Sequence, residues 1–96
     1  MIDELARAIR ERRVVEFDYQ RRHRVVEPHT LGVLDGVEEL LRYQTGGESR
    51  SGGVPDWRRF RVRAIQNLQL LSQRFGSRPG RTGRHASWDR ILEFVP

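Results

Sequence analysis

The sequence predicts a mainly β domain, a small five-stranded barrel with an N-terminal helix and a C-terminal helical extension. The chain has 96 residues, which indicates one domain, because two halves of so short a chain would each be too small to bury a stable core. Short runs of alternating apolar and polar residues, typical of strands, occupy its middle. Apolar residues recur at helical spacing near its two ends.

The N-terminal segment predicts a short helix over residues 3–12. Asp3 has a side chain that can cap the first amide groups of this helix. Leu5, Ala8 and Ile9 lie on one side of it at helical spacing. The apolar stripe is narrow, so we expect a single helix that packs one side against the barrel.

Three strands follow in the next part of the chain. In residues 15–19 apolar and acidic residues alternate, which is typical of a half-buried strand. Residues 25–34 predict a second strand, with Pro28 at an edge or a bulge because proline cannot donate to a ladder. The Asp35–Gly36 pair is a strong hairpin signal, and a third strand is expected over residues 37–45.

The second half of the chain is less regular. Residues 46–56 contain four glycines and are expected to form an exposed, mobile loop, either a hairpin tip or a lid over a ligand. Residues 57–62 predict a fourth strand and residues 68–72 a fifth that closes the barrel. Residues 74–85 carry four arginines, three glycines and no acid, which is typical of a linker.

The C-terminal segment predicts an amphipathic helix that Ser87 can cap. Its apolar residues recur at i, i+3, i+4 and i+7, and they are Trp88, Ile91, Leu92 and Val95. This stripe must cover the barrel or a second subunit. We therefore divide the chain into a barrel domain, residues 1–75, and a basic linker with the C-terminal helix, residues 76–96.

The composition limits the possible functions. Eighteen basic and thirteen acidic residues give a net charge of +5, and the basic residues are all arginine. Guanidinium groups fit phosphate and carboxylate groups and stack on aromatic rings, although a GC-rich genome would also replace lysine codons. The chain has no cysteine, which excludes disulfides, thiolate metal sites and thiol nucleophiles. It has neither a signal-peptide pattern nor a membrane span, so a cytoplasmic location is expected.

Four motifs in order resemble the WYL domain family. They are AIRERRVVEFDY (residues 8–19), RVVEP (24–28), LGVLDGVEELLRY (31–43) and WRRFRVRAIQNL (57–68). The resemblance implies an Sm-like, SH3-type barrel of the kind usually found downstream of a helix-turn-helix in bacterial transcriptional regulators. It also implies sensing of small or nucleotide-like ligands and of single-stranded nucleic acid.

The sequence departs from the family pattern at two places. Glu38, Glu39 and Leu40 stand where the family has Trp-Tyr-Leu, and Arg63 and Ala64 stand where many members have an acid and an arginine. Ligand chemistry that depends on the missing tyrosine or arginine is therefore not carried over. Because the first helix starts almost at Met1, we expect a divergent, stand-alone domain without a helix-turn-helix.

The fourth strand carries the strongest candidate site. If Phe60 points into the barrel, Arg59, Arg61 and Arg63 point outward together with Trp57. Bases can stack on such a ring while guanidinium groups follow the phosphates. A solvated face that only keeps the protein soluble is the alternative. Two further arginines are candidates, Arg42 as an extension of the row and Arg24 because it stands, like Arg61, at a polar motif position of the family.

These residues predict a ligand-sensing regulatory domain that binds an anionic ligand, with single-stranded nucleic acid or a nucleotide as the leading choice. The alternative is a protein-interaction module whose C-terminal helix binds a second copy or a partner regulator. No cofactor is expected, and the scattered His23, His29 and His85 do not have metal-ligand spacing. No base and nucleophile pair at catalytic positions, so we expect neither an enzyme nor a membrane partner.

Overall fold

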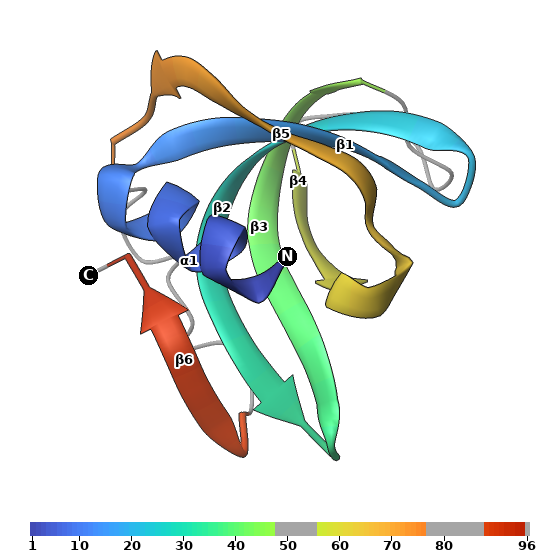
Figure 1. Cartoon of the computed structure of the whole chain (residues 1–96), viewed down its shortest axis with the longest axis vertical. Helices are drawn as coiled ribbons and strands as arrows, with labels where there is room; N and C mark the ends of the chain where they lie inside the picture. The colour runs from blue at the N-terminus through green and yellow to red at the C-terminus, as the bar shows by residue number, and fades with distance from the viewer. Residues whose placement is uncertain (48–55, 77–87, 96) are drawn as a thin grey trace.

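The computed structural model describes residues 1–47, 56–76 and 88–95 of the chain (Figure 1). It is mainly β, as predicted, with one N-terminal helix. The elements in chain order are α1 (Ile2–Glu11), β1 (Arg13–Tyr19), β2 (Arg22–Leu34), β3 (Val37–Gly47), β4 (Asp56–Arg61), the 3-10 turn η1 (Val62–Ala64), β5 (Gln66–Arg74) and β6 (Arg90–Phe94). No helix in these described ranges is long and apolar enough to cross a membrane.

The six strands form one antiparallel sheet in the order β4-β3-β2-β1-β5, with β6 paired to β2. The predicted closed barrel is not confirmed, because β4 and β5 end this order and do not pair with each other in the described residues. Figure 1 shows that the sheet curls strongly, so that β5 crosses over the ends of β2 and β3. Register shifts between β1 and β5 and between β2 and β3 mark the bulges that allow this bending.

The turn signals in the sequence are confirmed. Asp35 and Gly36 have φ values of 52° and 76°, the left-handed conformation that a tight two-residue hairpin requires. Pro28 lies at a register shift of the β2–β3 ladder, between Pro28 and Thr30. The missing amide of Pro28 thus falls where the ladder is irregular, as predicted. Residues 48–55 of the predicted glycine loop and residues 77–87 of the predicted linker lie outside the described residues.

Helix α1 covers the concave side of the sheet (Figure 1) and buries Leu5, Ala8 and Ile9. It begins one residue earlier than predicted, with Met1 at the N-cap position and no side-chain cap, so the predicted capping role of Asp3 is wrong. Asp3 lies in the first turn, where its negative charge still opposes the positive end of the helix dipole. Arg12 ends the helix with φ of 54°.

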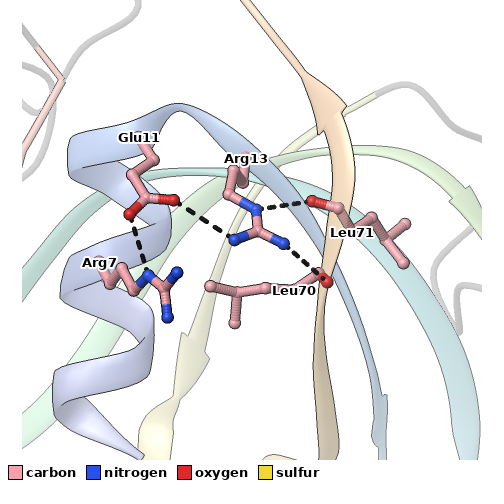
Figure 2. Close-up of polar contacts among 5 residues, drawn as sticks. All are labelled: Arg7, Glu11, Arg13, Leu70 and Leu71. Atoms are coloured by element: carbon pink, nitrogen blue, oxygen red, sulfur yellow. Dashed lines mark hydrogen bonds and ion pairs between the residues drawn. The ribbon is translucent and has the colours of Figure 1, made fainter.

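Arg13 ties the end of α1 to β5 (Figure 2). Its guanidinium donates hydrogen bonds to the carbonyl oxygens of Leu71, at 2.8 Å, and Leu70, at 3.3 Å. It also contacts Glu11, which accepts a hydrogen bond of 2.9 Å from Arg7. These two arginines, Arg7 first, lower the pKa of Glu11 below its ordinary value. The fork of a single arginine thereby joins the first helix to the last strand of the sheet order.

The core lies between α1 and the concave side of the sheet. Its members come from the helix and from all parts of the sheet: Leu5, Ala8, Ile9, Val15, Phe17, Tyr19, Val26, Leu31, Leu40, Phe60, Val62, Ile65 and Val95. Phe60 lies at its centre, stacked on Tyr19 with 4.2 Å between ring centroids and edge-on to Phe17 at 5.3 Å. Aromatic pairs in these geometries stabilise a core beyond the area that they bury.

The predicted C-terminal helix is wrong, because residues 90–94 form strand β6. The β1–β2 ladder ends at the pair Val15 and Val26, which leaves the same edge of β2 open over residues 30–33. Strand β6 occupies this edge, and the amide of Val95 donates to the carbonyl of His29 at 2.8 Å. Backbone groups on an open strand edge need partners, and this need overrides the helical spacing of the segment.

Candidate ligand-binding site

The alternation predicted for β4 is confirmed for its described side chains. Phe60 is 4% exposed and packs opposite Leu40 of β3, whereas Arg59 and Arg61 are exposed. Residues two positions apart in a strand share a face, so Arg59 and Arg61 lie together on the side opposite Phe60. We call this side the β4 arginine face. Trp57 lies opposite Tyr43 in the ladder, but its side chain is outside the described residues.

Arg59 connects the β4 arginine face to the tail of the chain. Its guanidinium lies 3.5 Å from the carboxylate of Glu39 on β3 and 4.5 Å from the ring centroid of Trp88. Trp88 in turn packs against Gly32 of β2, where a side chain would collide with the indole ring. Part of the charge of Arg59 is therefore balanced by Glu39, and its side chain is held in place on both sides.

Arg61 is the more available cation of this face. Its backbone amide donates to the hydroxyl of the buried Tyr19 at 3.1 Å, which fixes the end of β4 against the core. Its guanidinium makes no hydrogen bond or ion pair with any residue that the structure describes. A fixed backbone with an exposed, uncompensated guanidinium suits contact with an anion.

Arg63 does not continue the arginine row. Strand β4 ends at Arg61, and residues 62–64 turn through η1, which buries Val62. Arg63 is exposed on this turn and lines a pocket together with Arg90 of β6. The prediction treated residues 57–63 as one alternating run, but the 3-10 turn interrupts the period of two at Val62. The row on β4 consequently contains Arg59 and Arg61 without Arg63.

Arg24 and Arg42 lie inside the fold. They are 1% and 0% exposed, and the Cζ atom of Arg42 lies 3.6 Å from the ring centroid of Phe60. Arg24 lies 5.1 Å from the same ring and donates to the carbonyl of Tyr19 at 3.3 Å. Alternation along β3 explains this, since Arg42 shares the inner face with Leu40. Arg42 therefore does not extend the exposed row, and both arginines contact the aromatic core.

The remaining titratable side chains do not assemble another site. His23 contacts Glu16 at 3.3 Å and Asp18 at 3.5 Å. A hydrogen bond from Asn67, of 2.9 Å, is the main cause that lowers the pKa of Asp18, with a smaller contribution from His23. Buried His29 contacts the carbonyl of Glu27 through Nδ1 at 2.9 Å. Within the described residues, no group of three or more His, Cys, Asp or Glu side chains is arranged to hold a metal ion.

Sequence reasoning missed Trp88 and Arg90 as neighbours of the predicted site. Both precede or begin β6, which the sequence placed in a helix. Trp88 reaches the β4 arginine face only because β6 runs antiparallel to β2. A possible signal was the β-branched and aromatic composition of residues 91–95, which favours a strand.

The fold and this face define a small β domain with an exposed cationic surface, the general character of a binding module. A family model described as the WYL domain matches residues 1–70 of the 96, and the chain belongs to this family. WYL domains are regulatory, ligand-sensing modules. No curated protein and no solved structure matched the chain.

Proposed function

We propose that this WYL domain senses single-stranded nucleic acid or a nucleotide through the β4 arginine face, as a regulatory module without enzyme activity. The observation that carries the proposal is the alternation of β4, in which Arg59 and Arg61 are exposed on one side and Phe60 is buried on the other. The resemblance to bacterial transcription regulators supports a cytoplasmic role in the control of transcription.

Electrostatics favour an anionic ligand on this face. The net charge of +5 attracts polyanions over the whole chain, and Arg61 offers a guanidinium that no described residue engages. Trp57 stands two positions before Arg59 on the same strand. An aromatic ring near guanidinium groups is the combination that proteins use to stack bases and follow phosphates. Single-stranded ligands are favoured because their bases are free to stack.

The chemistry of the described side chains supports a binding role over catalysis. The two described histidines contact carboxylates, in the case of His23, and a backbone carbonyl, in the case of His29. Nucleophilic catalysis requires a base within hydrogen-bond reach of a hydroxyl, thiol or amine. Neither histidine has such a contact among the described residues.

Titration of fluorescent single-stranded DNA and RNA oligonucleotides at two salt concentrations tests the proposal. Phosphate contacts predict an affinity that falls steeply with salt. Arg61→Gln is expected to weaken binding of every sequence and to lower the slope of log affinity against log salt by about 0.7, the contribution of one phosphate contact on a single strand. Arg21→Gln removes the same charge at the β1–β2 turn and is the matched control.

Two results would contradict the proposal. One is the absence of oligonucleotide binding at low salt. The other is an equal loss of affinity in Arg61→Gln and Arg21→Gln, because the attraction would then depend on net charge and have no location on β4. Circular dichroism of both variants confirms that they retain the fold of the parent chain.

A second candidate function is a protein-interaction module, and exposed apolar side chains on β6 favour it. Ile91 and Phe94 are 48% and 52% exposed, and Leu92 lies between them at 36%. In the described residues β6 pairs only with β2, so its other edge is open to a second copy or a partner regulator. Light scattering on the intact chain and on Phe94→Glu separates these cases, since equal masses at the size of a monomer would exclude self-association through β6.

A further inference from the structure

A pocket of about 290 Å³ lies at the hairpin end of the sheet. In Figure 1 the β2–β3 hairpin extends beyond α1 at the bottom of the view, with β6 on one side and η1 on the other. Residues from all four elements and from the hairpin turn line the pocket: Val33, Gly36, Val37, Glu38, Arg63 and Arg90. Segments that are distant in the sequence therefore meet at one small hollow.

Strand register explains how the pocket forms. Val33 of β2 pairs with Arg90 of β6 on one side and with Glu38 of β3 on the other. Directly paired residues project from the same face of a sheet, so two long side chains flank the shorter Val33. Arg61 pairs with Glu39, and the turn that follows brings Arg63 beside the same end of β3. The result is a hollow with an apolar floor and charged walls.

The charges of the pocket are uncompensated. Arg63, Arg90 and Glu38 are all exposed, and none of the three makes a hydrogen bond or ion pair with another described residue. Guanidinium groups stay protonated at any physiological pH, so the pocket carries two positive charges and one negative charge. Two cations from different elements, with one carboxylate nearby, favour a ligand that has both an anionic group and a hydrogen-bond donor.

We propose that this pocket binds a small phosphate monoester of about the size of a mononucleotide. The phosphate bridges Arg63 and Arg90, a hydroxyl or amino group donates to Glu38, and the apolar part of the ligand lies on Val33 and Val37. A phosphate has three oxygens that can accept from two separate guanidinium groups, whereas a carboxylate is satisfied by one fork. The volume is near the lower end of small-molecule sites, roughly 300–1,000 Å³, which favours a small ligand over an oligonucleotide.

This site is distinct from the proposed nucleic-acid surface. It uses Arg63 and Arg90, whereas the β4 arginine face uses Arg59 and Arg61. Either site can therefore fail without the other. The pocket also depends on the tail of the chain, because Arg90 lies outside residues 1–70 that match the family.

Calorimetric titration of the full chain with adenosine 5′-monophosphate, adenosine and inorganic phosphate tests the proposal. The monophosphate is expected to bind at least about tenfold more tightly than adenosine, because adenosine lacks the charge-assisted hydrogen bonds. Arg63→Gln and Arg90→Gln are each expected to weaken binding of the monophosphate by about tenfold or more, the effect of losing a hydrogen bond to a charged group. Arg21→Gln and Arg61→Gln are expected to leave this affinity unchanged.

Glu38→Gln is an independent test that leaves both arginines in place. It removes a negative charge beside the phosphate, so inorganic phosphate is expected to bind more tightly. It also weakens the acceptor for the hydroxyl or amino group, so the advantage of the monophosphate over inorganic phosphate is expected to shrink. Thermal unfolding of each variant confirms that it folds.

The proposal is overturned if the monophosphate does not bind at low salt, or if Arg63→Gln and Arg90→Gln bind it as the parent chain does. It is also overturned if Arg21→Gln loses as much affinity as they do, which would indicate general attraction to net charge. Loss in Arg61→Gln with normal binding in Arg63→Gln would move the ligand to the β4 arginine face and would also refute the pocket. An unchanged preference in Glu38→Gln would refute the role of the carboxylate.

Discussion

Gly32 is the position where a single methyl group tests how the tail is held. Trp88 packs directly on its backbone, and the carbonyl of Arg90 on β6 lies beside it. In Gly32→Ala the added Cβ would lie 2.4 Å from Cε3 of Trp88 and 2.8 Å from the oxygen of Arg90. Both distances are shorter than real Cβ contacts permit, and one of the two neighbours is backbone. The substitution must therefore move β6 as well as the indole ring.

The size of the effect follows from these distances. Ordinary contact begins at 3.4 Å, so the ring must retreat by about 1 Å. Overpacking of this kind costs about 1–3 kcal/mol of the free energy of unfolding. In a domain of this length each kcal/mol lowers the melting temperature by about 4–8 °C. We therefore expect Gly32→Ala to melt roughly 4–20 °C below the parent chain.

Urea unfolding measures the free energy, and amide hydrogen exchange locates the change. Exchange is expected to rise in β6 and in the part of β2 that pairs with it, with little change in β1. Gly76→Ala is the matched control, because a Cβ there meets nothing within 4 Å; its effect is expected to stay within about 0.5 kcal/mol. In a Trp88→Ala background, Gly32→Ala is expected to cost less, since one of the two colliding groups is gone.

A Gly32→Ala variant with the stability and exchange pattern of the parent would refute this reasoning. So would an equal loss in Gly76→Ala. Full additivity of Gly32→Ala and Trp88→Ala would show that the indole ring does not press on this position, and the attachment of the tail would then depend on the β2–β6 ladder alone.

Two further predictions concern the core and the β1–β5 contact. Phe60→Ala removes the ring that packs against Tyr19, and we expect a loss of about 3–5 kcal/mol in urea unfolding; a loss below 1 kcal/mol would contradict its central place in the core. Asn67→Gly keeps the positive φ of 56° but removes the hydrogen bond that lowers the Asp18 pKa. This lowered pKa stabilises the fold above about pH 4, and the stabilisation is lost as pH falls through the folded-state pKa. NMR titration should show a raised Asp18 pKa in Asn67→Gly, and an unchanged pKa would contradict the assignment.

Local patterns predicted the elements whose structure is set by near neighbours in the sequence. The alternation from Val15 to Tyr19 and the Asp35–Gly36 pair predicted β1 and the β2–β3 turn, and the structure confirms both. The same alternation predicted that Arg59 and Arg61 share an exposed face. In each case the side-chain period or the turn conformation depends on residues within one element.

Contacts between distant segments were not predictable in this way. The helical spacing of residues 88–95 suggested a helix, but the open edge of β2 pairs with this segment as a strand. Arg42 was placed on the correct side of β3, yet nothing in the sequence showed that Phe60 would lie 3.6 Å from its guanidinium and that the side chain would be buried. The closed barrel failed for a related reason, because closure depends on whether β4 and β5 meet.

The tail explains why the ligand of this domain does not follow from its family. The matching region ends at residue 70, whereas Trp88 and Arg90 lie beyond it. Trp88 covers Gly32 and contacts Arg59, and Arg90 forms one wall of the pocket. Glu38, at the first position of the family triplet, forms another wall. A carboxylate and a guanidinium thus stand where a family-like domain without this tail would offer neither, and the specificity of this chain must be measured on the whole chain.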